Sequence, residues 1–182
     1  MARTAAPDPR SAAQGFVDHL NSVLNRTVSD AHLSLIPLPH DPSAFEIARF
    51  VKREAAPLEL LGSSLRLFVR QIIVVADGHC RTESYEYRLQ RDVARQSWLI
   101  RWEYLRNPPR PDYAYPAAHA HVNGEWERAE ALDRLHIPTR RVPLELVVWH
   151  LIAEWGATPR SDDWQSILSE SIEGFDERQT AR

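Results

Sequence analysis

Apolar residues recur at helical spacing in three segments. The first begins at Ser11, which is a suitable N-cap. The second follows Pro143 and ends before Gly156, so proline occupies the first turn and glycine follows the end. The third starts near Ser161. The apolar positions are Phe16, Val17, Leu20, Val23 and Leu24; then Leu144, Val147, Val148, Leu151, Ile152 and Trp155; then Trp164, Ile167, Leu168, Ile172 and Phe175. The pattern predicts one N-terminal and two C-terminal helices.

Alternating apolar and polar residues predict strands between these helices. Residues 31–38 form a short edge strand that ends at prolines, and residues 65–75 form a central strand that is apolar on both faces towards its end. Residues 85–90 and 98–104 alternate strictly, which indicates a β-meander with one aromatic face and one charged face. Residues 45–51 match the helical period and favour a helical turn.

A proline-rich segment, residues 106–116, leads into a further strand at residues 118–122. His119 and His121 share one face of this strand, while small residues take the other face. We expect the small face, including Val122, to pack on the core and the histidine face to be exposed.

These elements predict an α+β fold. We expect a mainly antiparallel sheet of four to five strands, with the N-terminal helix and the two C-terminal helices packed on one face. Residues 11–176 form the predicted single domain, residues 1–10 a disordered tail and residues 177–182 a frayed tail.

Composition is typical of a soluble globular protein. The 182 residues are 43% apolar and 26% charged, and no apolar run reaches the roughly 20 residues of a membrane helix. The N-terminus lacks the apolar core of a signal peptide, so we expect a cytoplasmic location with no membrane partner. One cysteine, Cys80, excludes an internal disulfide and a cysteine-based zinc site.

Charge gives a mixed indication. The net charge of −3 disfavours a broadly electrostatic nucleic-acid binder, and Lys52 is the only lysine. Residues 81–110 nevertheless hold seven arginines against four acids. This pattern is compatible with a local basic face on the protein. It is equally compatible with arginines that only solvate the outer face of a strand.

His119 and His121 are the candidate catalytic residues, because two imidazoles on one strand face can act as acid and base on a phosphodiester. Candidate substrate-binding residues are Arg101, Arg106 and Arg140 for phosphate, and Tyr87 and Tyr115 for a hydrogen bond or base stacking. This hypothesis describes an RNA-binding, metal-independent ribonuclease or nucleotide-modifying enzyme with no cofactor.

Two other interpretations stay open. If a divalent metal binds, its ligands are His119, His121 and His136, with Asp112 or Glu145 as an oxygen donor. Otherwise the histidines are structural and the chain binds another protein. The sequence contains no P-loop, G-x-G-x-x-G, G-x-S-x-G or H-E-x-x-H motif. Their absence excludes most families of nucleotide-driven enzymes, dehydrogenases and hydrolases that these motifs define.

Three segments also carry a family resemblance. They are Tyr85-Glu86-Tyr87-Arg88-Leu89-Gln90, Trp98-Leu99-Ile100-Arg101-Trp102, and Tyr115-Pro116-Ala117-Ala118-His119-Ala120-His121-Val122, with a proline-rich loop before the last and a long helix after it. Their order resembles the TumE-like toxins of bacterial toxin–antitoxin modules over residues 83–155. Glu103 stands where that family has an aspartate, and Ala117-Ala118 where it has a histidine doublet.

The resemblance implies a small α+β toxin partnered by a helix-turn-helix antitoxin, with His119 and His121 at its working centre. We therefore expect a toxin-like or defence-related bacterial protein that acts on RNA or nucleotides. The alternative is a non-enzymatic protein-interaction or accessory subunit of a bacterial defence or toxin–antitoxin system.

Overall fold

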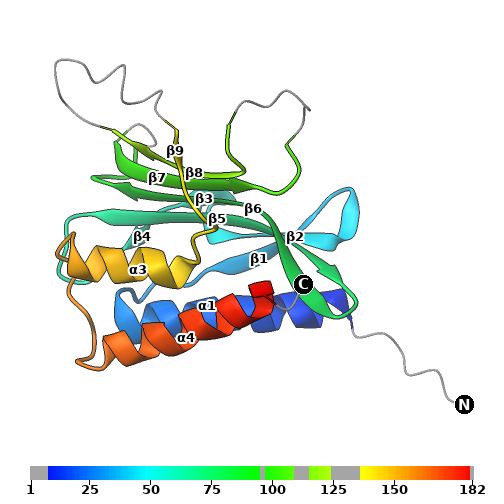
Figure 1. Cartoon of the computed structure of the whole chain (residues 1–182), viewed down its shortest axis with the longest axis horizontal. Helices are drawn as coiled ribbons and strands as arrows, with labels where there is room; N and C mark the ends of the chain where they lie inside the picture. The colour runs from blue at the N-terminus through cyan, green and yellow to red at the C-terminus, as the bar shows by residue number, and fades with distance from the viewer. Residues whose placement is uncertain (1–7, 95–96, 109–114, 124–135, 181–182) are drawn as a thin grey trace, which may run out of the picture.

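The structure is a computed structural model, and it describes residues 8–94, 97–108, 115–123 and 136–180, with side chains up to residue 173. Within these residues the chain forms a large antiparallel sheet and three helices, so the α+β class is confirmed (Figure 1). The helices are α1 (Pro9–Thr27), α3 (Leu144–Ala153) and α4 (Trp164–Thr180). All three lie on one side of the sheet (Figure 1).

The sheet has nine strands within the described residues, and the prediction of four to five was too low. Seven follow the order β1-β2-β5-β6-β7-β8-β9, while β3 pairs with β2 and β4 pairs with β5. Their bounds are β1 Ser34–Leu38, β2 Asp41–Val51, β3 Glu54–Ala56, β4 Leu58–Glu59, β5 Arg66–Ala76, β6 His79–Gln90, β7 Trp98–Leu105, β8 Ala118–Val122 and β9 Ile137–Pro138.

Strand β2 replaces the helical turn predicted for residues 45–51. Phe45 and Ile47 are buried towards the helices, and Ala44 and Ala48 are buried as well, so the strand is covered on both faces. Burial on both faces removes the alternation that identifies a strand, and the remaining apolar positions match the helical period by coincidence.

Two helices begin or end a few residues from their predicted limits. Helix α1 begins at Pro9, because Asp8 caps it by accepting a hydrogen bond from the N–H of Arg10 (3.1 Å), and not at Ser11. Helix α4 continues to Thr180. Residues 1–7 and 181–182, and the side chain of Phe175, lie outside the described residues. The domain limits themselves stay a prediction.

The core lies between the sheet and the three helices. Its largest fully buried side chains include Tyr87 from β6, Leu24 from α1, Leu151 from α3 and Leu168 from α4. A hydrogen bond also joins the sheet to the helix layer. The hydroxyl oxygen of Tyr85 accepts it from the N–H of Val142 (2.7 Å), just before α3. Among the described residues, no helix combines the length and apolar character that a membrane crossing requires.

Candidate functional site

The histidines of β8 lie on the sheet face that points away from the helices. In the strand register Glu103 is opposite His119, and Arg101 is opposite His121. The neighbouring positions Ala118 and Ala120 face the core, as predicted. Because strand side chains alternate, His119 and His121 therefore share their face with Arg101 and Glu103.

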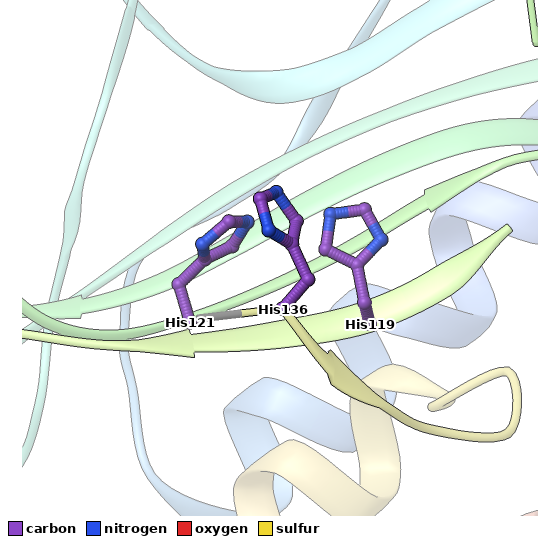
Figure 2. Close-up of side chains that lie close together, drawn as sticks. All are labelled: His119, His121 and His136. Carbon is purple, nitrogen blue, oxygen red and sulfur yellow. The ribbon is translucent and has the colours of Figure 1, made fainter. Parts of the chain in front are cut away.

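Three imidazoles meet at this position, because His136 lies just before β9 and β9 pairs with β8 (Figure 2). The ring centroids are 4.3 Å apart for His121 and His136, 4.9 Å for His119 and His136, and 5.0 Å for His119 and His121. One ring nitrogen from each of the three lies within 4.8 Å of the others. Tyr115 stacks on His136 at 3.7 Å between centroids.

The expectation of an exposed histidine face was wrong. His119 is 5% exposed and His121 is 3% exposed, because their neighbours pack over them: His136 lies against both rings, and Glu103 lies beside both. Val122, which we expected in the core, is 39% exposed. The two faces of β8 are thus both covered over most of the strand.

Hydrogen bonding fixes the tautomer of His119. Its Nδ1 lies 2.8 Å from the carbonyl oxygen of Pro116, and a carbonyl oxygen can only accept. In the neutral ring Nδ1 therefore carries the proton, and Nε2 has the lone pair. This arrangement is typical of metal-binding histidines, whose second nitrogen donates to an outer partner.

His121 has no hydrogen-bond partner on either buried ring nitrogen within the described part of the chain. Burial lowers its pKa below the ordinary value, and the nearby Arg101 guanidinium adds to this shift, while Glu103 opposes it. The ring is consequently neutral at neutral pH and has a free lone pair. Buried polar atoms without partners are uncommon in proteins and call for an explanation.

Glu103 is a site residue that sequence reasoning did not select. Its Oε2 lies 3.0 Å from Nε2 of His121, 3.5 Å from Nε2 of His119 and 3.2 Å from Nε of Arg101. Two sequence signals pointed to it: the alternation of β7, which places Arg101 and Glu103 on one face, and the position of Glu103 where the resembled family has an aspartate.

Two of the predicted substrate-binding residues join the histidines, namely Arg101 and Tyr115. Tyr115 is 46% exposed, and its ring lies 6.3 Å from that of His119. The guanidinium of Arg101 lies 5.0 Å from the Trp98 ring, whose edge approaches His121. One predicted arginine and one predicted tyrosine therefore lie at the cluster.

The other three predicted substrate-binding residues lie elsewhere. Tyr87 is 2% exposed on the helix-facing side of the sheet, where strand alternation separates it from the histidines. Arg106 donates from Nε to the carbonyl oxygen of Thr82 (3.1 Å) and lies 3.6 Å from Glu83. Arg140 is exposed beyond the end of β9.

The predicted oxygen donors are not at the cluster in the described residues. Asp112 lies outside the described residues. Glu145 lies on α3, across the sheet from the histidines, where its Oε1 accepts from Ser171 Oγ (2.7 Å) and lies 3.1 Å from Nε2 of His19. Proximity in sequence to His136 was misleading, because α3 runs along the opposite side of the sheet.

Glu145 predicts a pH dependence of stability. Burial raises the pKa of this carboxyl, but the hydrogen bonds from His19 and Ser171 outweigh burial and hold the pKa below its ordinary value. A lowered folded pKa contributes stability above about pH 4.3, and this contribution is lost as the pH falls through the folded pKa. We expect Glu145→Gln to flatten the loss of stability between about pH 5 and pH 3. Urea unfolding at several pH values measures this, and an unchanged pH profile would contradict it.

A shallow hollow opens beside the histidines. Its volume is about 220 Å³, and its polar lining comes from Arg70, Ser84, Glu86, Glu103 and His119. Residues of both the histidine cluster and the charged strand face thus contact the same open space. It is the side from which a small molecule can approach His119 and Glu103.

The arginines of this face are paired with carboxylates. Arg70 lies 2.7 Å from Glu46, and Arg101 lies 3.2 Å from Glu103. Arg88 likewise lies 3.1 Å from Glu86. Among the described residues, these arginines therefore do not produce an uncompensated basic surface at the site.

Comparison of the chain with protein-family models, with curated proteins and with solved structures finds no match. The resemblance to TumE-like toxins stays a prediction. The functional argument accordingly rests on the geometry of the histidine cluster.

Proposed function

We propose that this protein binds one divalent transition-metal ion through His119, His121 and His136, and hydrolyses phosphate esters of RNA or nucleotides there. The observation that carries the proposal is the convergence of three imidazoles whose nitrogens lie within 4.8 Å of one another. Three histidines with room for further ligands are a set that zinc and related ions accept.

The spacing favours an ion over acid and base catalysis by two histidines. An acid and a base act on different oxygens, on opposite sides of the phosphorus, and each needs a hydrogen bond of about 2.8 Å. One nitrogen of each ring lies within 4.8 Å of the other two, so the three converge towards one point. An atom-sized ion fits the space between three rings better than a phosphate group does.

The protein contributes orientation and recognition to this chemistry. The carbonyl oxygen of Pro116 orients His119, and the ladder between β8 and β9 holds His136 over both other rings. A bound ion lowers the pKa of a coordinated water and polarises a phosphoryl oxygen. Hydrolysis of a phosphodiester would consume one water, break one P–O bond and leave a phosphate monoester and an alcohol. Hydrolysis of a mononucleotide would likewise consume one water and leave inorganic phosphate and an alcohol.

We also propose that the chain is a toxin-like protein with a helix-turn-helix antitoxin as partner. Two observations support this proposal. The segments that carry the resemblance form β6, β7 and β8, which are neighbours in the sheet. On the sheet face away from the helices, Arg101, His119 and His121 from these segments and the adjoining Glu103 belong to one cluster.

Metal removal and reloading test the hydrolase. The full chain is stripped with a chelator, reloaded with Zn²⁺, Mn²⁺, Co²⁺ or Ni²⁺, and measured for bound metal and for cleavage of labelled single-stranded RNA and mononucleotides. We expect about one ion per chain and cleavage that depends on it. His121→Ala should lose both, whereas His150→Ala, an exposed histidine on α3, should keep both. Cleavage that persists unchanged in excess chelator, or a chain that binds no ion, would overturn the proposal.

A second candidate function is a non-enzymatic interaction module in which the ion is structural. The burial of His119 and His121 and the paired arginines favour it, since both restrict access of a polyanion. In the same experiment, one bound ion without cleavage of any phosphate ester would support this module.

A further inference from the structure

We infer that a second hollow, on the sheet face that points away from the helices, binds the nucleobase of the substrate and prefers bases with an exocyclic amino group. The inference rests on the nucleotide substrate of the proposed function, and it concerns the part of the nucleotide that lies away from the histidines. Base binding itself requires neither the ion nor hydrolysis.

The second hollow adjoins the hollow that opens beside His119. Its volume is about 350 Å³, which is within the range of small-molecule sites. Arg70 and Glu86 line both hollows, so the two spaces meet at these residues. One molecule can therefore occupy both, with one end near the histidines and the other end in the second hollow.

Strand pairing sets the distance between the two ends. Arg70, Glu86, Glu103 and His119 stand opposite one another in the successive ladders of β5, β6, β7 and β8. Because neighbouring strands lie about 4.8 Å apart, this row places Glu86 roughly 10 Å from His119. A single nucleotide with its phosphate at the histidines spans this distance and brings its base to the second hollow.

Flat and apolar groups form one part of the lining, which includes Ala55, Pro57 and Phe68. The guanidinium of Arg88, which also lines the hollow, lies 3.9 Å from the centre of the Phe68 ring. Nucleobases stack on aromatic rings and on arginine planes. A flat base fits such a wall better than a compact ammonium group does.

Two buried oxygen atoms of the lining lack a hydrogen bond within the described part of the chain. Gln90 is 1% exposed, and its Oε1 has no partner, whereas its Nε2 donates to the carbonyl oxygen of Asp92 (2.6 Å). Oε1 of Glu86 is also buried without a hydrogen bond. Buried acceptors of this kind call for a donor, and an exocyclic amino group supplies two N–H donors.

The charges of the second hollow favour the same kind of ligand. Its lining holds the carboxylates of Glu46, Glu54 and Glu86 against the guanidinium groups of Arg70 and Arg88. Arg70 lies 2.7 Å from Glu46, and Arg88 lies 3.1 Å from Glu86. This balance disfavours a second phosphate here, and with it a longer RNA strand. The substrate class that it favours is a mononucleotide with an amino-bearing base.

Calorimetric titration of the metal-free full chain with nucleosides tests the inference, because nucleosides lack the phosphate that the ion would bind. Cytidine and uridine form one matched pair, and guanosine and inosine form the other. In each pair the first base carries the exocyclic amino group that the second lacks. We expect each amino-bearing nucleoside to bind about tenfold more tightly than its partner. Equal affinities within either pair, or no measurable binding of any of the four, would overturn the inference.

Two variants test whether the base lies in the second hollow. Gln90→Met removes the buried acceptor, and Glu54→Lys reverses an exposed charge in the lining. Each should reduce the preference for cytidine over uridine severalfold. The matched control is Glu59→Lys, since Glu59 is exposed on the next strand, β4, and is not among the described residues that line the hollow. It should keep the parental preference.

Urea unfolding checks the fold of each variant, and Glu54→Lys keeps the test valid if Gln90→Met fails to fold, because Glu54 is on the surface. A parental preference in folded Glu54→Lys would place the base elsewhere. A nucleoside preference in a chain that binds no ion would keep the base site and overturn the hydrolase. Ion-dependent cleavage in a chain without any nucleoside preference would keep the hydrolase and overturn the base site.

Discussion

Saturation with the preferred divalent ion is expected to raise the free energy of unfolding by about 4 kcal/mol, when free ion exceeds its dissociation constant about a thousandfold. The reason is that the ligands come from separate strands, β8 and the residue before β9, and are close together only in the folded chain. Denaturant unfolding with and without the ion measures the difference. In His121→Ala the ion-dependent part of the stability should disappear.

Two controls decide whether the stabilising ion binds at the three histidines. His150→Ala removes a histidine that is exposed on α3, so its ion-dependent stabilisation should equal that of the parent. Metal-free His121→Ala should itself fold, because the substitution removes a ring whose buried nitrogens lack hydrogen-bond partners. An equal gain in stability for the parent and His121→Ala would mean that the ion binds elsewhere, and the three-histidine site would be wrong.

Sequence patterns predicted the elements that are buried on one face. Strands β6 and β7 alternate because only one side of each meets the helices. Helix α3 is apolar on most sides, with Glu145 and His150 as its polar residues, and its limits were predicted from the proline before it and the glycine after it. Strand β2 was missed because it is covered on both sides. The strand count was too low because β3, β4 and β9 have only two or three residues each, too few to show a period.

The candidate site was predicted in part. Spacing alone placed His119 and His121 on one face, but it did not predict their burial, which depends on His136 and Glu103 reaching them through strand pairing. His136 was among the proposed ligands, and the two-residue ladder of β9 brings it over the other rings. Glu145 was proposed from its position in the sequence, and the chain crosses to the helix side of the sheet before reaching it.

Tyr87 shows how alternation within one strand separates a core residue from a site residue. The strict pattern of β6 places Tyr87 and Arg88 on opposite faces, and the face of Tyr87 is the one that packs on the helices. Its ring stacks on Tyr85 at 4.5 Å between centroids, and its hydroxyl donates to Oε1 of Gln71 (3.0 Å). Burial also raises its pKa well above the ordinary value, so the hydroxyl remains protonated.

Tyr87→Ala is therefore expected to lower the free energy of unfolding by about 3 to 5 kcal/mol, as truncation of a large buried ring does. Tyr87→Phe keeps the ring but leaves Gln71 without its donor, which should cost about 1 to 3 kcal/mol. Urea unfolding measures both, with Val93→Ala as a control, because Val93 is 70% exposed and should change stability by less than about 0.5 kcal/mol. Cobalt affinity should be unchanged in Tyr87→Phe, since the sheet separates this hydroxyl from the histidines. A Tyr87→Phe variant with parental stability and impaired cobalt binding would instead assign Tyr87 to the site.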